Sequence, residues 1–216
     1  MRFGRRVRRF RGQRGSELAA TLILVRHAAH VHLDRTLSGR MPGVALSDRG
    51  RAQAARLARR LAERGLAVVQ ASPLDRAQET ARAIAGAAGL SVETADALEE
   101  IDFGKWTGAR FDALAGDPAW ERWNTERSTA RPPGGESMGE AQGRIAAHLV
   151  AAAAAHDCGT VVMVSHADVI RAAVCHVLGL SLDAYWRFDV DPASVTTLMW
   201  EHWGGRLLRL NEGVDS

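Results

Sequence analysis

The sequence predicts an α/β fold built around a mainly parallel sheet. Short, largely apolar runs, typical of strands buried on both faces, occur at 22–25, 66–70 and 160–165. A helical pattern follows each run, so strands and helices alternate along the chain. The 216 residues are enough for one well-cored domain, with 46% hydrophobic and 25% charged residues. We assign residues 19–216 to that single domain.

The first apolar run ends abruptly in Arg26 and His27. Charged and polar side chains rarely continue a buried strand, so we expect both to emerge at the carboxyl edge of the sheet. Open α/β sheets bind their ligands at that edge. Taken alone, the pair is equally consistent with a strand that simply reaches solvent.

A turn-rich loop and a first helix come next. Gly39, Pro42 and Gly43 mark turns in the loop. Ser47 is a suitable N-cap for the helix, and Gly65 is a natural place for it to stop.

The second strand run leads directly into a second helix, for which we expect Ser72 as the N-cap and Arg76 in the first turn. Free N–H groups at a helix start attract anions, and an added guanidinium favours phosphate. The alternative is a surface arginine paired with Asp75 or Glu79. The helix should fade near Gly89.

The middle of the chain is less regular. A short strand is expected at 91–94, followed by the acid-containing stretch 98–108. Residues 109–136 should form a small helical excursion over the top of the sheet. Ser137 and Glu140 then predict a capping box at the start of a long helix.

The opening pattern recurs near the end of the chain. The strand run 160–165 also ends in a histidine, His166, before a helical stretch. Two histidines and Arg76 are therefore expected at one edge of the same sheet, where together they suit phosphate. The end of the chain predicts a hairpin around 204–205, placed most simply at the sheet edge.

Charge is concentrated in the first fourteen residues, which hold seven arginines and no acid. The rest of the chain has 21 basic against 25 acidic residues. We expect residues 1–18 to form a basic, disordered tail. Only this tail has the charge to bind nucleic acid, and we do not expect nucleic acid as a partner. We expect no membrane partner either, because no apolar run is long enough for a membrane helix. Two cysteines without a paired spacing favour a cytoplasmic protein.

Five separated motifs together resemble the histidine phosphatase superfamily, the phosphoglycerate mutase-like group. They are LVRH at 24–27, SPLDRAQETA at 72–81, LEEIDFGKWTG at 98–108, PGGES at 133–137 and VSHADVIRA at 164–172. They follow the family's order over roughly residues 21–175, and their agreement is far more specific than any one motif. The resemblance implies a three-layer αβα sandwich, with no metal and no organic cofactor.

The resemblance also implies roles for individual residues. His27 would be the nucleophile, and Arg26, Arg76 and His166 would hold the phosphate. Glu100 would protonate the leaving oxygen, with Glu99 as its rival. Because alternation along a strand would put these two acids on opposite faces, only one can serve.

The sequence departs from the family pattern in the loop after His27. Ala28 replaces the usual glycine, the loop is one residue shorter, and the usual Asn and Arg are missing. The side chains that could take over their phosphate contacts are His30, His32, Arg35 and Arg40. Ser38, Gly39 and Arg40 are candidates to bind the substrate.

We therefore expect a phosphatase that hydrolyses a phosphomonoester of a small metabolite through a phosphohistidine. The alternatives are mutase-type phosphoryl transfer, a non-catalytic phosphate sensor and a metal-dependent hydrolase. The metal reading rests on His30, His32 and Asp34, which form an HxHxD pattern although such hydrolases would want a histidine at position 35. The substrate's identity and the oligomeric state stay open, with a homodimer as one option.

Overall fold

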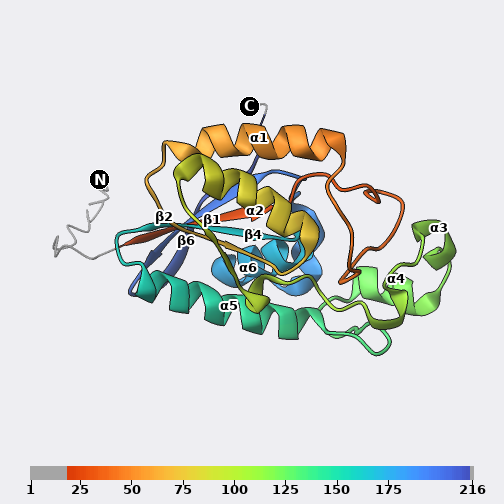
Figure 1. Ribbon diagram of the computed structural model, residues 1–216. Coiled ribbons are helices and arrows are strands. Elements are labelled where there is room, and N and C mark those ends of the chain that lie inside the picture. The colour runs from red at the N-terminus through yellow and green to blue at the C-terminus, as the bar shows by residue number, and fades with distance from the viewer. Residues whose placement is uncertain (1–18, 215–216) are drawn as a thin grey trace, which may run out of the picture.

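A computed structural model describes residues 19–214, and the tail expected at 1–18 lies outside this range. Its core is one six-stranded sheet in the order β3-β2-β4-β1-β5-β6 (Figure 1). The strands are β1 (Ala20–Arg26), β2 (Leu66–Ala71), β3 (Val92–Thr94), β4 (Thr160–Ser165), β5 (Val195–Glu201) and β6 (Gly204–Glu212). β1 to β4 are parallel, and the β5–β6 hairpin adds two antiparallel strands at one edge, as predicted.

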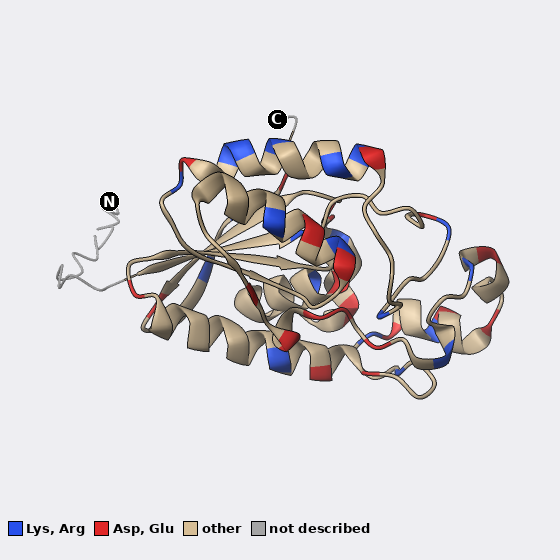
Figure 2. Ribbon diagram, in the orientation of Figure 1, with Lys and Arg blue, Asp and Glu red and all other residues tan. Residues whose placement is uncertain are grey.

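Helices cover both faces of the sheet, so the expected αβα sandwich is confirmed. α1 (Asp48–Ala62) and α2 (Asp75–Ala88) lie on one face, and α5 (Met138–Ala155) and α6 (Ala167–Leu178) on the other (Figure 1). The two cores follow from the alternation of side chains along β1. Leu22 and Leu24 pack in the α5/α6 core, whereas Ile23 and Val25 pack in the α1/α2 core. The outer face of α1 carries basic side chains (Figure 2).

The first helix begins as the sequence predicts and ends slightly earlier. The Ser47 hydroxyl accepts a hydrogen bond from the Gly50 N–H, and α1 ends at Ala62 rather than at Gly65. Gly50 also permits a close crossing of the chain, because a Cβ there would lie 1.9 Å from the carbonyl oxygen of Ala29. The first turn of α1 therefore packs directly on the loop that follows His27.

The predicted N-cap of α2 is wrong. Leu74 is the cap residue and makes no side-chain capping bond. Ser72 instead extends the pairing of β2 with β4 by one residue, because its N–H donates to the Val164 carbonyl at 3.0 Å. Its hydroxyl forms a hydrogen bond with the His166 ring. Arg76 does lie in the first turn of α2, as expected. Gly89 ends the helix with a φ of 70°.

The capping box of α5 is confirmed, with reciprocal bonds between Ser137 and Glu140. None of the described helices is both long and apolar enough to cross a membrane.

The irregular middle of the chain lies beyond the carboxyl ends of the parallel strands (Figure 1). It contains the short helices η1 (Asp96–Leu98), η2 (Gly104–Trp106), α3 (Phe111–Leu114) and α4 (Pro118–Thr125). A further short helix, η3 (Leu182–Arg187), follows α6. Trp123 is fully buried and packs edge-on against Phe103 and Trp106, which gives the excursion a small aromatic core of its own.

Candidate active site

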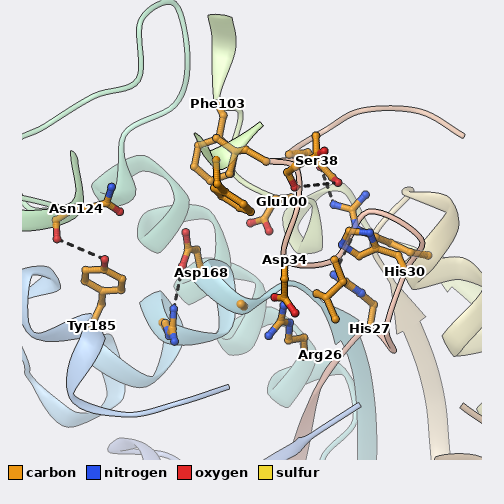
Figure 3. Close-up of a pocket in the computed structure, with 18 of the residues that line it drawn as sticks. Arg26, His27, His30, Asp34, Ser38, Glu100, Phe103, Asn124, Asp168 and Tyr185 are labelled. Atoms are coloured by element: carbon orange, nitrogen blue, oxygen red, sulfur yellow. Dashed lines mark hydrogen bonds and ion pairs between the residues drawn. The ribbon is translucent and has the colours of Figure 1, made fainter. Parts of the chain in front are cut away.

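A cavity of about 320 Å³ opens at the carboxyl edge of the sheet (Figure 3). One end is lined by Arg26, His27, His30 and Arg76. The other end is lined by side chains of the middle excursion, η3 and the first turns of α6. The sheet topology explains this position, because β2, β4 and β1 are neighbours and their parallel carboxyl ends meet there.

His27 follows β1 and is only 3% exposed. Its Nδ1 lies 2.8 Å from the carbonyl oxygen of Ala28, which can only accept, so we assign the ring proton to Nδ1. The Nε2 lone pair then faces Arg76, whose Nε donates to it at 3.3 Å. Burial, with help from the charges of Arg76 and Arg26, holds the pKa of His27 well below its usual value. The ring is therefore neutral, with an available lone pair.

Arg76 joins the two histidines that the sequence placed at this edge. Its Nη2 donates to the Gly39 carbonyl at 2.6 Å and lies 3.3 Å from Nδ1 of His166. Because a guanidinium can only donate, Nδ1 of His166 accepts from Arg76, and the protonated Nε2 donates to the Ser72 hydroxyl at 2.8 Å. The rings of His27 and His166 are 5.1 Å apart. Burial is also the main cause that lowers the pKa of His166.

Two guanidinium nitrogens at this end are buried without a hydrogen-bond partner among the described residues, Arg26 Nε and Arg76 Nη1. Arg26 is otherwise anchored by a 2.7 Å bond from Nη1 to the Val190 carbonyl. Leaving buried charged donors unpaired is costly, and an anion such as a phosphoryl group would satisfy them. The four predicted residues Arg26, His27, Arg76 and His166 are thus brought together.

The two adjacent acids occupy different environments, although the stretch that follows η1 is not a strand. Glu100 lines the cavity, accepts from the Ile101 N–H at 2.9 Å and has its Oε2 3.9 Å from Nδ1 of His166. Burial, followed by the negative charge of Asp168, raises the pKa of Glu100 to about 7. Glu99 instead pairs with Arg40 at 3.4 Å. The two acids are separated as expected, but strand alternation is not the cause, because this stretch is not a strand.

The candidate substrate residues divide into two groups. Ser38 and Gly39 line the cavity. Arg40 is not among the lining residues; it donates to the Glu100 carbonyl at 2.7 Å and to the Glu136 carboxylate at 3.1 Å. Arg40 thus supports the segment that carries Glu100.

Among the side chains considered as replacements for the missing phosphate ligands, His30 lines the cavity. Its Nδ1 accepts from the His32 N–H at 3.2 Å, and its ring lies 5.4 Å from that of His27. Burial, aided by Arg76 and Arg26, lowers the pKa of His30 to about 4. The imidazole is therefore neutral, and its Nε2–H is a donor.

Sequence reasoning missed the far wall of the cavity. Asp168 and Arg171 of α6 line it, together with Arg127 and Tyr185 (Figure 3). Arg127 is sandwiched between Trp123 and Tyr185 and donates to Asp168 at 2.9 Å. The available signal was the position of Asp168 and Arg171, i and i+3 on one helix face just after His166.

Within residues 19–214, no group of three or more His, Cys, Asp or Glu side chains is placed to hold a metal ion. The HxHxD pattern does not form such a cluster. His30 uses Nδ1 on the backbone N–H of His32, while Asp34 lies at the cavity with a φ of 62°.

The comparisons with known proteins agree with this geometry. The model of the histidine phosphatase superfamily (branch 1) matches residues 22–213. Phosphoserine phosphatase 1 of Hydrogenobacter thermophilus is 36% identical over 195 residues, which cover 88% of this chain and 91% of that one.

Two solved structures extend the likeness to the fold. The mycobacterial glucosyl-3-phosphoglycerate phosphatase has a TM-score of 0.82 and 26% identity, over 90% of this chain and 100% of that one. A mutant phosphoserine phosphatase from Entamoeba histolytica, in complex with phosphoserine, has a TM-score of 0.80 and 26% identity, over 89% and 96%. With its phosphate-competent edge, its fold and a family match across nearly the whole described range, this chain belongs to the histidine phosphatase superfamily.

Proposed function

We propose that this protein is a phosphatase that hydrolyses a phosphomonoester of a small metabolite through a phosphohistidine at Nε2 of His27. The observation that carries the proposal is the state of His27: a neutral ring, locked by its Nδ1–H bond to Ala28, with a lone pair beside Arg76. A nucleophile needs that lone pair, and the surrounding cations disfavour its protonation.

In the first step, Nε2 of His27 attacks phosphorus, the P–N bond forms, and the bond to the leaving oxygen breaks. Arg26 and Arg76 supply the unpaired N–H donors, which bind the equatorial oxygens as charge spreads over them. Glu100, with a pKa near 7, gives its proton to the leaving alkoxide. In the second step Glu100, now a carboxylate, takes a proton from water as that water attacks phosphorus and frees Nε2.

His30 completes the phosphate site in this proposal. The family's Asn is missing from the loop, and His30 offers a neutral N–H at the same end of the cavity. A neutral donor binds a phosphoryl oxygen without adding to the cationic field that already lowers the pKa of His27.

Hydrolysis is favoured over mutase activity because the relatives named above are phosphatases. A mutase must also protect its phosphoenzyme from water and return the phosphoryl group. Incubation with 3-phosphoglycerate distinguishes the two activities: we expect free phosphate to accumulate. Faster accumulation of 2-phosphoglycerate would establish the mutase.

The proposal is tested by trapping the phosphoenzyme. Acid quenching is avoided because phosphohistidine is acid-labile, so the wild-type protein is incubated with ³²P-labelled substrate and denatured in alkali. We expect label on the wild type and neither label nor turnover on His27→Ala. His148→Ala is the matched control, since His148 lies on α5, bonds Gln70 of β2 and does not line the cavity. Labelled His27→Ala would refute His27 as the nucleophile.

A further inference from the structure

We propose that Arg171 binds a carboxylate on the alcohol portion of the substrate, so that the preferred substrates are phosphomonoesters of carboxylic acids. This inference rests on the proposed phosphatase function and names the substrate class for it. It gives a substrate-binding role to the far wall of the cavity, which the phosphoryl transfer does not use. The proposal depends on how the side chains of that wall are paired.

Arg171 makes no short hydrogen bond among the described residues, whereas its neighbour Arg127 makes two. The closest approach of Arg171 to Asp168 is 3.5 Å from Nη1 to Oδ1, and its Nη2 is 3.9 Å from Asp189. Both distances exceed the usual 2.7–2.9 Å of a charge-assisted hydrogen bond. Nε of Arg171 is buried without a partner among the described residues. The guanidinium also lies 5.6 Å from the centroid of the Tyr185 ring, so it is held beside the cavity without a short hydrogen bond among the described residues.

Arg127 is more fully paired, although its Nε, like that of Arg171, has no partner among the described residues. It donates to Asp168 at 2.9 Å and to the Asn124 side chain at 3.2 Å, and two aromatic rings enclose it. Its side chain is 5% exposed, against 21% for Arg171. Arg127 therefore neutralises Asp168 and fixes its position, and Arg171 is left as the cation that an incoming anion can reach.

The charges of this wall specify a carboxylate with a donor group beside it. Two guanidiniums face one carboxylate there, so the wall keeps a net positive charge, and Asp189 is largely in solvent. Asp168 Oδ1, which is not used by Arg127, can accept from an ammonium or hydroxyl next to the bound carboxylate. An α-amino or α-hydroxy acid supplies both groups on one carbon.

The two ends of the cavity are close enough for one small molecule. Arg171 and Asp168 are both among the charges that perturb the pKa of Arg26, which lies at the phosphate end. Arg26, Asp168 and Arg171 all line the same cavity. A cavity of about 320 Å³ leaves room for only a modest leaving group beyond the phosphate.

The test uses substrate pairs that differ by a single group. O-Phospho-L-serine exceeds O-phosphoethanolamine by the carboxylate alone, and 3-phosphoglycerate exceeds 2-hydroxyethyl phosphate in the same way. We expect the wild type to prefer the carboxylate member of each pair by about 10- to 100-fold in kcat/KM. The ratio of phosphoserine to 3-phosphoglycerate then distinguishes an ammonium beside Asp168 from a hydroxyl.

Arg171→Gln should remove most of this preference and leave kcat/KM for phosphoethanolamine within about threefold of the wild type. Arg187→Gln is the matched control, because that exposed arginine of η3 faces Trp186 and does not line the cavity. A preference that survives in Arg171→Gln would overturn the assignment.

If Arg171→Gln does not fold, the wild-type ratios still decide the question, since a wild type without carboxylate preference refutes the inference. Failure of the phosphatase proposal is distinguishable from this outcome. In that case wild-type protein would not hydrolyse any member of the pairs, nor p-nitrophenyl phosphate.

Discussion

Glu99 and Glu100 are adjacent in the chain, yet the Glu99 carboxylate pairs with Arg40 at 3.4 Å while that of Glu100 lies in the cavity, 3.9 Å from His166. The backbone after η1 is extended at Glu99, with a ψ of 153°, and this turns the two side chains in different directions. Arg40 stabilises the arrangement by also donating to the Glu100 carbonyl. Of these two acids, only Glu100 lines the cavity.

Glu100→Gln should slow the hydrolysis of alkyl phosphates by about 10²–10⁴-fold, because the poor alkoxide leaving group loses its proton donor. p-Nitrophenyl phosphate should be affected far less, since its leaving group needs little protonation. Rapid-quench kinetics with both substrates measure this difference.

Glu99→Gln is the control for this experiment. It removes an ion pair with Arg40 but no group from the cavity, so both substrates should be affected alike and weakly. If the dependence on leaving group appears in Glu99→Gln instead, the acid role belongs to Glu99.

The activity on alkyl phosphates should fall as the pH rises through about 7. The general acid must be protonated, and the raised pKa of Glu100 places its loss of the proton at about that pH. His27 should not impose an acidic limb near pH 6, because its pKa is held well below the usual histidine value. Profiles of kcat/KM for an alkyl phosphate and for p-nitrophenyl phosphate test this, and a basic limb shared equally by both would contradict it.

His30→Ala should raise KM for phosphorylated substrates and lower kcat/KM by about 10-fold or more, since one neutral donor to the phosphoryl group is lost. His30→Gln keeps an N–H donor with about the reach of Nε2 and should restore part of that loss. His32→Ala is the matched control, because the His30 ring uses only the backbone N–H of His32. Equal activities of the Ala and Gln variants would show that His30 only fills space.

Activity should survive prolonged treatment with EDTA and should be inhibited by vanadate. The described chemistry needs only side-chain donors, and vanadate adopts the trigonal bipyramidal geometry that those cations would stabilise. Loss of activity on chelation, restored by zinc, would revive the metallohydrolase reading of His30, His32 and Asp34.

Gly50→Ala should destabilise the protein by about 1–3 kcal/mol or more and reduce turnover, because its Cβ would collide with the Ala29 carbonyl. That backbone leads directly away from His27, so the clash should displace the catalytic loop. Gly143→Ala on α5 is the matched control: nothing lies within 4 Å of its Cβ, and a helical alanine should stabilise by about 0.5–1 kcal/mol. Thermal unfolding of both variants checks the contrast.

The strands and the phosphate end of the site were predictable because they depend on local patterns. An apolar run that ends in His27 or His166 can be read directly, and parallel strands must bring such ends to one edge. The same reasoning placed Arg76 in the first turn of α2. Where a group is positioned by its own strand or helix, the sequence was sufficient.

Long-range pairing explains the errors. Serine is a common helix N-cap, but Ser72 bonds Val164 of β4 and His166 just after it, which lie far along the chain. The far wall escaped notice for the same reason: Arg127 and Asp168 meet across 41 positions. When a polar residue pairs with a distant partner, neither segment shows a pattern of apolar and polar residues that would reveal the pair.

The pairing of β1 with β4, in which Arg26 stands opposite Ser165, has a consequence for how the enzyme first becomes active. Because β4 and α6 are made late in translation, a nascent chain that lacks them holds His27 without His166. Loop closure between such distant strands is also slow compared with forming α1 or α2. Catalytic competence should therefore arise only after β4 and α6 have been made, and in refolding it should lag behind the recovery of helical circular dichroism.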